Sequence, residues 1–220
     1  MLLNKCPNAI QIYDRVFDIE TNARLWLNIS IQLSKINSND IYHGFKVIDI
    51  LFSAIKNKEQ IDESYNTKLI ERLYWFLNCG KTNNELKAES ERAGGGSSEK
   101  LYSFEKDDTL IFTAFYRTYK IDIEEELDTL HWWKFMAMFN DLDEKSKLVG
   151  VYMYYRGLDI NESSIYKHAS EKEKQKILEM KNFVSLDSVN VGSVITNEQE
   201  DEIRQERLKI LEARKNGNGN

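Results

Sequence analysis

Pro7 is the only proline in this chain of 220 residues. A proline inside a helix removes a backbone hydrogen bond and clashes with the preceding turn, so a chain without one beyond residue 7 can form helices throughout. Most of the bulk comes from 11 Tyr, 10 Phe and 4 Trp, and large rings of this kind suit packing between helices. The composition therefore predicts a mainly α protein.

The hydrophobic pattern changes its period near residue 21. Apolar and polar residues alternate over residues 9–20 around Asp14 and Arg15, which predicts a short N-terminal β-hairpin. From Asn22 onward the apolar residues recur every three or four positions. A helix is expected to begin there, with Thr21 or Asn22 as its N-cap.

Three amphipathic helices are predicted before residue 80. Asp40 is the expected cap of the second, and Gly80 is the expected stop of the third. Their apolar stripes are Leu25, Ile29, Leu33 and Ile36, widened by Trp26 and Leu27; then Ile41, Phe45, Ile48, Phe52 and Ile55; then Leu69, Ile70, Leu73, Phe76 and Leu77.

Residues 81–100 are polar and contain the run GGGSS, which is typical of a flexible linker. Helical patterns return afterwards, including a helix that ends near Gly157 and another that opens with a Ser170–Glu173 capping box. We expect a hairpin and helical unit over 1–80, a linker over 81–100, a helical core over 101–187, and a charged helical or disordered tail over 188–220.

The charge balance excludes some classes of partner. The 36 acidic and 30 basic residues give a net charge of -6, whereas a nucleic-acid-binding protein normally presents a basic face to the phosphates. No apolar run reaches the roughly 18 residues that cross a bilayer, so no membrane association is expected. Cys6 and Cys79 match no metal-ligand spacing and fit a reducing compartment.

Few residues suggest chemistry. His131, near Asp128, is the best acid–base candidate, but no nucleophile or second ligand lies at a usable spacing, and a locally hydrogen-bonded structural histidine is favoured. Acidic clusters lie at 107–108, 122–126 and 141–144, and none has the spacing of a calcium-binding loop. We interpret them as solvated residues at helix starts, where the helix dipole stabilises negative charge. We expect no catalytic residue, no cofactor and no metal.

The segment 127–139 is expected to form a helix that is apolar almost all round, as in a central or interface helix. Trp132 shares the larger apolar stripe and is expected in the core, while Trp133 points about 100° away and is expected to face a partner. The methionines suit adaptable contacts with a partner, and filling gaps in the core is an equally good interpretation of them. The candidate protein-binding residues are Trp133, Met136, Phe139, Met153 and Tyr155.

Several motifs carry a resemblance to a known family. They are F-E-K-D at Phe104 to Asp107, A-F-x-x-x-Y-x-I-D at Ala114 to Asp122, L-H-W-W-x-F at Leu130 to Phe135, Y-R at Tyr155-Arg156, I-L-E-M-K at Ile177 to Lys181, and FDIETNAR at Phe17 to Arg24. With them the chain resembles the bacteriophage Gp15 family of long-tailed phages and prophages over about residues 1–187.

The resemblance implies a tail-module protein and, by analogy, a tail assembly chaperone. Its expected partners are the tape-measure protein, whose apolar helical stripe must be shielded from water, the tail tube protein, and further copies of itself. It would act in the host bacterial cytoplasm and be absent from the mature virion. Two alternatives remain open: a structural tail or connector subunit kept in the virion, and an enzyme built around His131.

Overall fold

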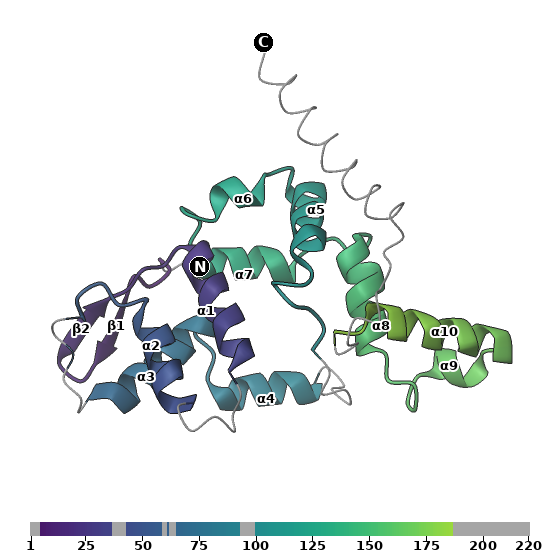
Figure 1. Cartoon of the computed structure of the whole chain (residues 1–220), viewed down its shortest axis with the longest axis horizontal. Coiled ribbons are helices and arrows are strands. Elements are labelled where there is room, and N and C mark those ends of the chain that lie inside the picture. Colours follow the sequence, from purple (N-terminus) through teal and green to yellow (C-terminus); the bar gives the residue numbers. More distant parts are fainter. Residues whose placement is uncertain (1–4, 37–42, 59–60, 62–64, 93–99, 187–220) are drawn as a thin grey trace, which may run out of the picture. The chain divides into compact units, whose positions relative to one another are not determined.

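The computed structural model is mainly helical with one β-hairpin (Figure 1). It describes residues 5–36, 43–58, 61, 65–92 and 100–186. The chain divides into two compact units, the first made of Met1–Gly95 and Lys120–Leu142 and the second of Gly96–Tyr119 and Asp143–Asn220. The segment Lys120–Leu142, which the sequence placed with the C-terminal core, thus groups with the N-terminal unit.

The first unit contains the hairpin and six helices among its described residues. Their bounds are β1 Ala9–Ile12, β2 Arg15–Asp18, α1 Ala23–Lys35, α2 His43–Phe52, α3 Asn66–Leu77, α4 Asn83–Arg92, α6 Ile123–Glu126 and α7 Trp132–Asn140.

The hairpin lies where the alternating pattern predicts it. Its strands are antiparallel, and Ile10 pairs with Phe17 on the buried face while Gln11 pairs with Val16 on the exposed face. Tyr13 in the turn has a φ of 53°, which is uncommon for a bulky residue. The alternation fixes the register because a slip by one residue would expose both buried side chains.

Helix α1 begins at the predicted cap. The Asn22 side chain accepts a hydrogen bond from the Leu25 N–H at 2.9 Å. The buried face is centred on Trp26, whose indole N–H donates to the Glu20 carbonyl at 2.7 Å, with Ile29 beside it. Leu25 is only half-buried, so the apolar stripe is rotated toward Trp26.

Helices α2 and α3 differ in how well their apolar stripes predict burial. In α3, Leu69, Leu73 and Phe76 are fully buried, as expected. In α2, Phe45 is 70% exposed, and Leu51 supplies the buried contact instead. Both stripes follow helical spacing, so helical spacing alone does not select the buried face. The expected cap Asp40 lies outside the described residues.

The expected linker contains helix α4. A capping box opens it: the Thr82 N–H donates to the Glu85 carboxylate at 2.7 Å, and the Glu85 N–H donates to the Thr82 hydroxyl at 3.3 Å. This S/T-x-x-E signal defines a helix start even where apolar residues are scarce. The GGGSS run and the tail 188–220 lie outside the described residues.

The second unit is helical, with bounds α5 Asp108–Tyr119, η3 Leu148–Met153, α8 Tyr154–Gly157, α9 Ser164–His168 and α10 Glu171–Val184. The predicted end at Gly157 and the predicted Ser170–Glu173 capping box are both confirmed. The segment η3 is π-helical, and Gly150 is required there because an added Cβ would collide with the Glu144 carbonyl oxygen.

Candidate interaction surface

His131 is the N-cap of α7. Its Nδ1 accepts from the Trp133 N–H at 3.1 Å, and its Nε2 lies 2.9 Å from the Pro7 carbonyl oxygen. Because a carbonyl can only accept, Nε2 carries the hydrogen and Nδ1 is unprotonated. Both ring nitrogens are therefore used within the fold, as in the structural interpretation of this histidine.

This geometry predicts that acid weakens the protein. Burial lowers the pKa of His131 below its ordinary value of 6.5, because the charged ring would be poorly hydrated and Nδ1 would face the Trp133 N–H. The unfolded chain then binds a proton that the folded chain does not, so stability is full above pH 6.5 and falls as the pH drops below it. Urea unfolding on both sides of that pH measures the effect.

The matched variant is His131→Asn, which keeps a side-chain acceptor at the N-cap but does not titrate. It should unfold with a smaller dependence on pH in that window. An unchanged slope would show that another group causes the acid sensitivity.

The start of α7 is joined to the start of α1 by backbone hydrogen bonds. The Ala23 N–H donates to the Leu130 carbonyl at 2.8 Å, and the Trp132 N–H donates to the Thr21 carbonyl at 2.7 Å. Two side-chain bonds reinforce the junction: Arg24 Nε to Asp128 Oδ1 at 2.6 Å and Arg24 Nη2 to the Glu124 carbonyl at 2.8 Å. These contacts explain why residues 120–142 belong to the first unit.

The two adjacent tryptophans cap the C-terminus of α3. The Trp132 indole N–H donates to the Leu77 carbonyl at 2.8 Å, and the Trp133 indole N–H donates to the Phe76 carbonyl, also at 2.8 Å. Carbonyls of the last helical turn lack partners within the helix, so the Trp132 indole satisfies a group that would otherwise need water. The Trp133 indole is a second donor to the Phe76 carbonyl, which also accepts from the Cys79 N–H at 3.0 Å. Trp132 is 1% exposed, which confirms its predicted place in the core.

Gly80 completes this helix end. Cys79 and Gly80 have φ values of 54° and 87°, and the Gly80 N–H donates to the Trp75 carbonyl at 2.8 Å, as in a Schellman motif. A Cβ at Gly80 would lie 2.9 Å from Trp133 Cη2. The predicted helix stop is therefore also a place where the Trp133 ring approaches the backbone closely.

Trp133 forms part of a surface that we call the tryptophan face, made of Arg72, Trp75, Trp133 and Lys134. The Trp75 and Trp133 rings meet edge to face with centroids 5.4 Å apart, and Arg72 Cζ lies 5.0 Å from the Trp75 centroid. Both rings are half-buried, while Arg72 and Lys134 are exposed. The face is a short aromatic surface with one cation, Arg72, over Trp75 and a second, Lys134, next to Trp133 in the sequence.

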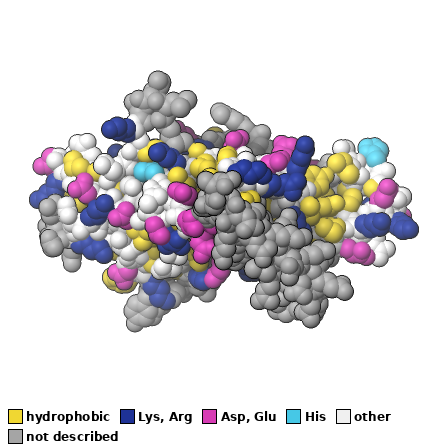
Figure 2. Space-filling view, turned by 90° about the horizontal axis from the view of Figure 1, so that it is seen from above, with side chains coloured by type: hydrophobic (Ala, Val, Ile, Leu, Met, Phe, Trp, Pro, Cys, Tyr) yellow, Lys and Arg dark blue, Asp and Glu magenta, His cyan; other side chains and the backbone are white. Residues whose placement is uncertain are grey.

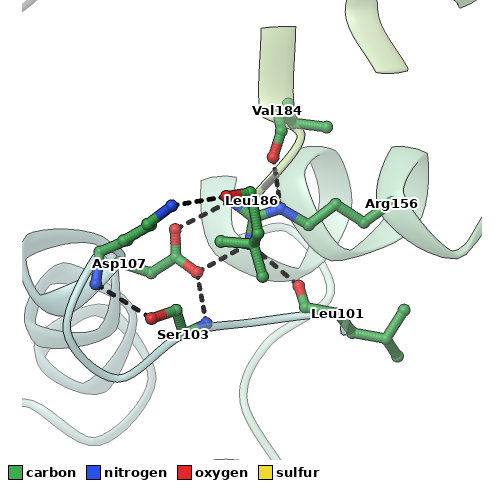
Figure 3. A network of polar contacts seen from close by, with 7 residues as sticks. Leu101, Ser103, Asp107, Arg156, Val184 and Leu186 are labelled. Carbon is green, nitrogen blue, oxygen red and sulfur yellow. Dashed lines mark hydrogen bonds and ion pairs between the residues drawn. The ribbon is translucent and has the colours of Figure 1, made fainter. Parts of the chain in front are cut away.

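A buried ion pair forms the centre of the second unit (Figure 3). Arg156 Nη1 lies 2.7 Å from Asp107 Oδ2 and Nη2 lies 3.0 Å from Oδ1, with both residues less than 5% exposed. The Ser103 N–H also donates to Oδ2 at 2.9 Å. The acidic cluster at 107–108 is thus not simply a solvated helix start, because Asp107 is buried in the ion pair with Arg156.

The same arginine ties the beginning of the second unit to its end. Its Nε donates to the Val184 carbonyl and its Nη1 to the Leu101 carbonyl, while Lys106 Nζ donates to the Leu186 carbonyl (Figure 3). Three segments distant in the sequence therefore meet at one guanidinium: residues 101–107, Arg156 itself and the end of α10. This arrangement holds the end of α10 against the loop that precedes α5.

Large apolar side chains remain exposed on the second unit. We call four of them the outer apolar set: Tyr154, Ile165, Leu178 and Phe183. Figure 2 shows hydrophobic side chains gathered on one face of the region that carries α8 and α10. The Phe183 ring is also 6.3 Å from that of Tyr152. Exposed apolar side chains are typical of a surface that binds another protein where they gather into a patch.

Sequence reasoning overlooked the outer apolar set, although α10 carried a signal for it. Ile177, Met180 and Val184 follow helical spacing and take the inner face, with Val184 fully buried. Leu178 and Phe183 then fall on either side of that face. Apolar residues beyond the width of one buried stripe indicate an additional contact surface.

Two kinds of site, a metal site and a membrane-spanning helix, can be assessed within the described residues. Among them no group of three or more His, Cys, Asp or Glu side chains is placed to hold a metal ion. No helix in the described ranges is long and apolar enough to cross a bilayer. Asp122 caps α6 by accepting the Glu124 N–H at 3.1 Å, which is the helix-start role expected for that cluster.

Comparison with known protein families shows to which family the chain is related. The family described as Bacteriophage Gp15 protein matches residues 2–186. The chain belongs to this family. It is thus a phage protein related to the tail or the head–tail region of the particle. No match was found among curated proteins, and none among solved structures.

The motifs that carry the Gp15 resemblance build the two units. L-H-W-W fastens α7 to α1 and α3, and FDIETNAR supplies β2 and the Asn22 cap. F-E-K-D and Y-R meet in the pair of Asp107 with Arg156. These family motifs therefore explain the fold more directly than they explain binding.

The five candidate binding residues are divided between the units. Trp133 and Met136 are half-buried in the first unit, and Trp133 has the internal partners described above. Phe139 is only 4% exposed and stacks on its neighbour in α7, so its ring is a core group and is not offered to a partner. Met153 and Tyr155 are half-buried in the second unit.

Proposed function

We propose that the chain is a tail assembly chaperone, which binds the tape-measure protein and recruits tail tube subunits. It acts in the host cytoplasm by binding and not by catalysis, associates with further copies of itself, and leaves before the virion is complete. The observation that carries the proposal is the outer apolar set on the second unit. Membership of a phage family supports the tail context.

The physical basis is the shielding of apolar surface. Burying apolar area gains about 25 cal/mol per Å², so an exposed set of Tyr, Ile, Leu and Phe is stabilised when an apolar helical stripe covers it. A tape-measure protein presents such a stripe before the tube closes around it. Contact between the two surfaces removes apolar area of both from water and requires no cofactor.

The decisive experiment is co-expression with the tape-measure and tail tube genes, followed by pull-down. Serine replacements of Leu178 and Phe183 together should reduce recovery of the tape-measure protein at least tenfold, since loss of an interface hot spot costs about 2 kcal/mol or more. The matched control is Phe45→Ser, which removes an equally apolar side chain that is 70% exposed on the first unit. Circular dichroism checks that both variants fold.

Equal recovery with both variants would contradict the assignment of the interface to the second unit. Failure of the unmodified chain to capture either tail protein would contradict the chaperone role itself. Mass spectrometry of purified particles separates the alternative, because many copies in the virion would identify a structural tail or connector subunit.

A further inference from the structure

We infer that the tryptophan face on the first unit is a second docking site, which takes an acidic protein segment with a large apolar side chain beside its carboxylates. This goes beyond the binding of the tape-measure protein, because it uses other residues on the other unit. The face contains the residue types that dominate the energy of protein interfaces, Trp and Arg.

The aromatic part of the face is apolar and held in place. The Trp133 indole N–H is directed to the Phe76 carbonyl, so the accessible part of the ring is hydrocarbon. The backbone at Gly80 lies close to this ring, and the Trp75 ring contacts it edge to face. A ring fixed from three sides loses little conformational freedom when a partner side chain packs on it.

The charged part of the face has donors to spare within the part of the chain that the structure describes. Arg72 uses Nε to bond the Gln11 carbonyl at 3.3 Å while its plane lies over Trp75, which leaves the two terminal nitrogens to donate elsewhere. Within the described residues neither Arg72 nor Lys134 has a carboxylate partner, whereas Lys68, one turn from Arg72, is paired with Glu71 at 2.7 Å. The face is locally positive in a chain of net charge -6.

This combination fits a carboxylate-bearing segment. A guanidinium stacked on an aromatic ring is oriented for paired hydrogen bonds to a carboxylate. An adjacent apolar side chain can then cover the two tryptophan rings. Nucleic acid fits less well, because its binding normally requires several phosphate contacts spread over a basic surface.

The test uses the full chain and two fluorescein-labelled synthetic peptides, one of alternating Glu and Leu pairs and one with Gln in place of Glu. Fluorescence anisotropy should show that the acidic peptide binds about tenfold more tightly than the Gln peptide, and that added salt weakens only the acidic one. Arg72→Gln combined with Lys134→Gln should remove this preference. The control Lys172→Gln, an equal charge change on exposed α10, should keep it.

Arg72→Lys keeps the charge but not the fork of donors, so it should restore part of the preference, while thermal unfolding checks the contact with Gln11. Equal binding of the two peptides, or an unchanged preference in the double variant, would overturn the inference. So would equally tight binding of a single-stranded oligonucleotide, which would mark the face as a general anion site. None of these results bears on capture through Leu178 and Phe183.

Discussion

Replacing Arg156 with methionine is expected to destabilise the second unit by about 3 to 5 kcal/mol, because removing one partner of a buried ion pair leaves the other charge uncompensated. Asp107 would remain buried at 3% exposure, and the carbonyls of Val184 and Leu101 would lose their donor. Denaturant unfolding measures the loss. The transition of the second unit should move to lower denaturant.

Lys174→Met provides the matched control. It removes an ion pair of similar length, 2.8 Å to Glu171, in which the carboxylate is 90% exposed. Exposed pairs contribute about 0 to 1 kcal/mol, so little change is expected. Adding Asp107→Leu to Arg156→Met should recover part of the loss, since it removes the unpaired charge. Similar losses from Arg156→Met and Lys174→Met would show that the buried pair does not hold the unit together.

Trp132→Ala is expected to cost the first unit about 3 to 5 kcal/mol, the range for truncating a large buried ring. The ring is 1% exposed, stacks on Phe135 with centroids 5.6 Å apart, and donates to the Leu77 carbonyl at 2.8 Å. Its loss leaves a cavity between α3 and α7 together with an unsatisfied carbonyl. Equilibrium unfolding followed by circular dichroism checks the value.

Trp133 provides the comparison for this prediction. From the sequence, Trp133→Ala should leave the fold largely intact and weaken only binding. The structure leads us to expect a loss of about 0.5 to 1.5 kcal/mol from the indole hydrogen bond to the Phe76 carbonyl, which keeps the Cys79 N–H as a donor. Losing the ring contacts with Trp75 and Phe76 adds to this loss. Trp133→Phe keeps most of the ring and should cost less. An unfolding midpoint unchanged in Trp133→Ala would show that the internal contacts of this ring contribute nothing to stability.

The two buried groups have related consequences for function. Trp132 and Arg156 each hold together segments that are far apart in the sequence, one in each unit. The surfaces proposed for binding lie on those same units, at Trp133 and Phe183. Variants of the buried groups should therefore lose binding only together with folding. The surface variants Leu178→Ser with Phe183→Ser, and Arg72→Gln with Lys134→Gln, should reduce binding and leave the units folded.

The sequence by itself determined the features that depend on neighbours along the chain. Alternation of apolar residues predicts the hairpin, and hydrogen-bonding side chains at helix starts predict the caps at Asn22 and Ser170. The spacing in α3 predicts its buried residues and its stop at Gly80. These are local effects, because caps and periodicity act within one or two helical turns.

Only the tertiary structure decided which faces meet. Asp107 and Arg156 are 49 residues apart, and Trp132 and Leu77 are 55 apart, so nothing in their local patterns indicates these partners. The same applies to Phe45, which follows helical spacing yet is 70% exposed, whereas Leu51 in the same helix is fully buried. Periodicity shows that a helix has an apolar face, but the partner of that face is selected by the packing of the whole unit.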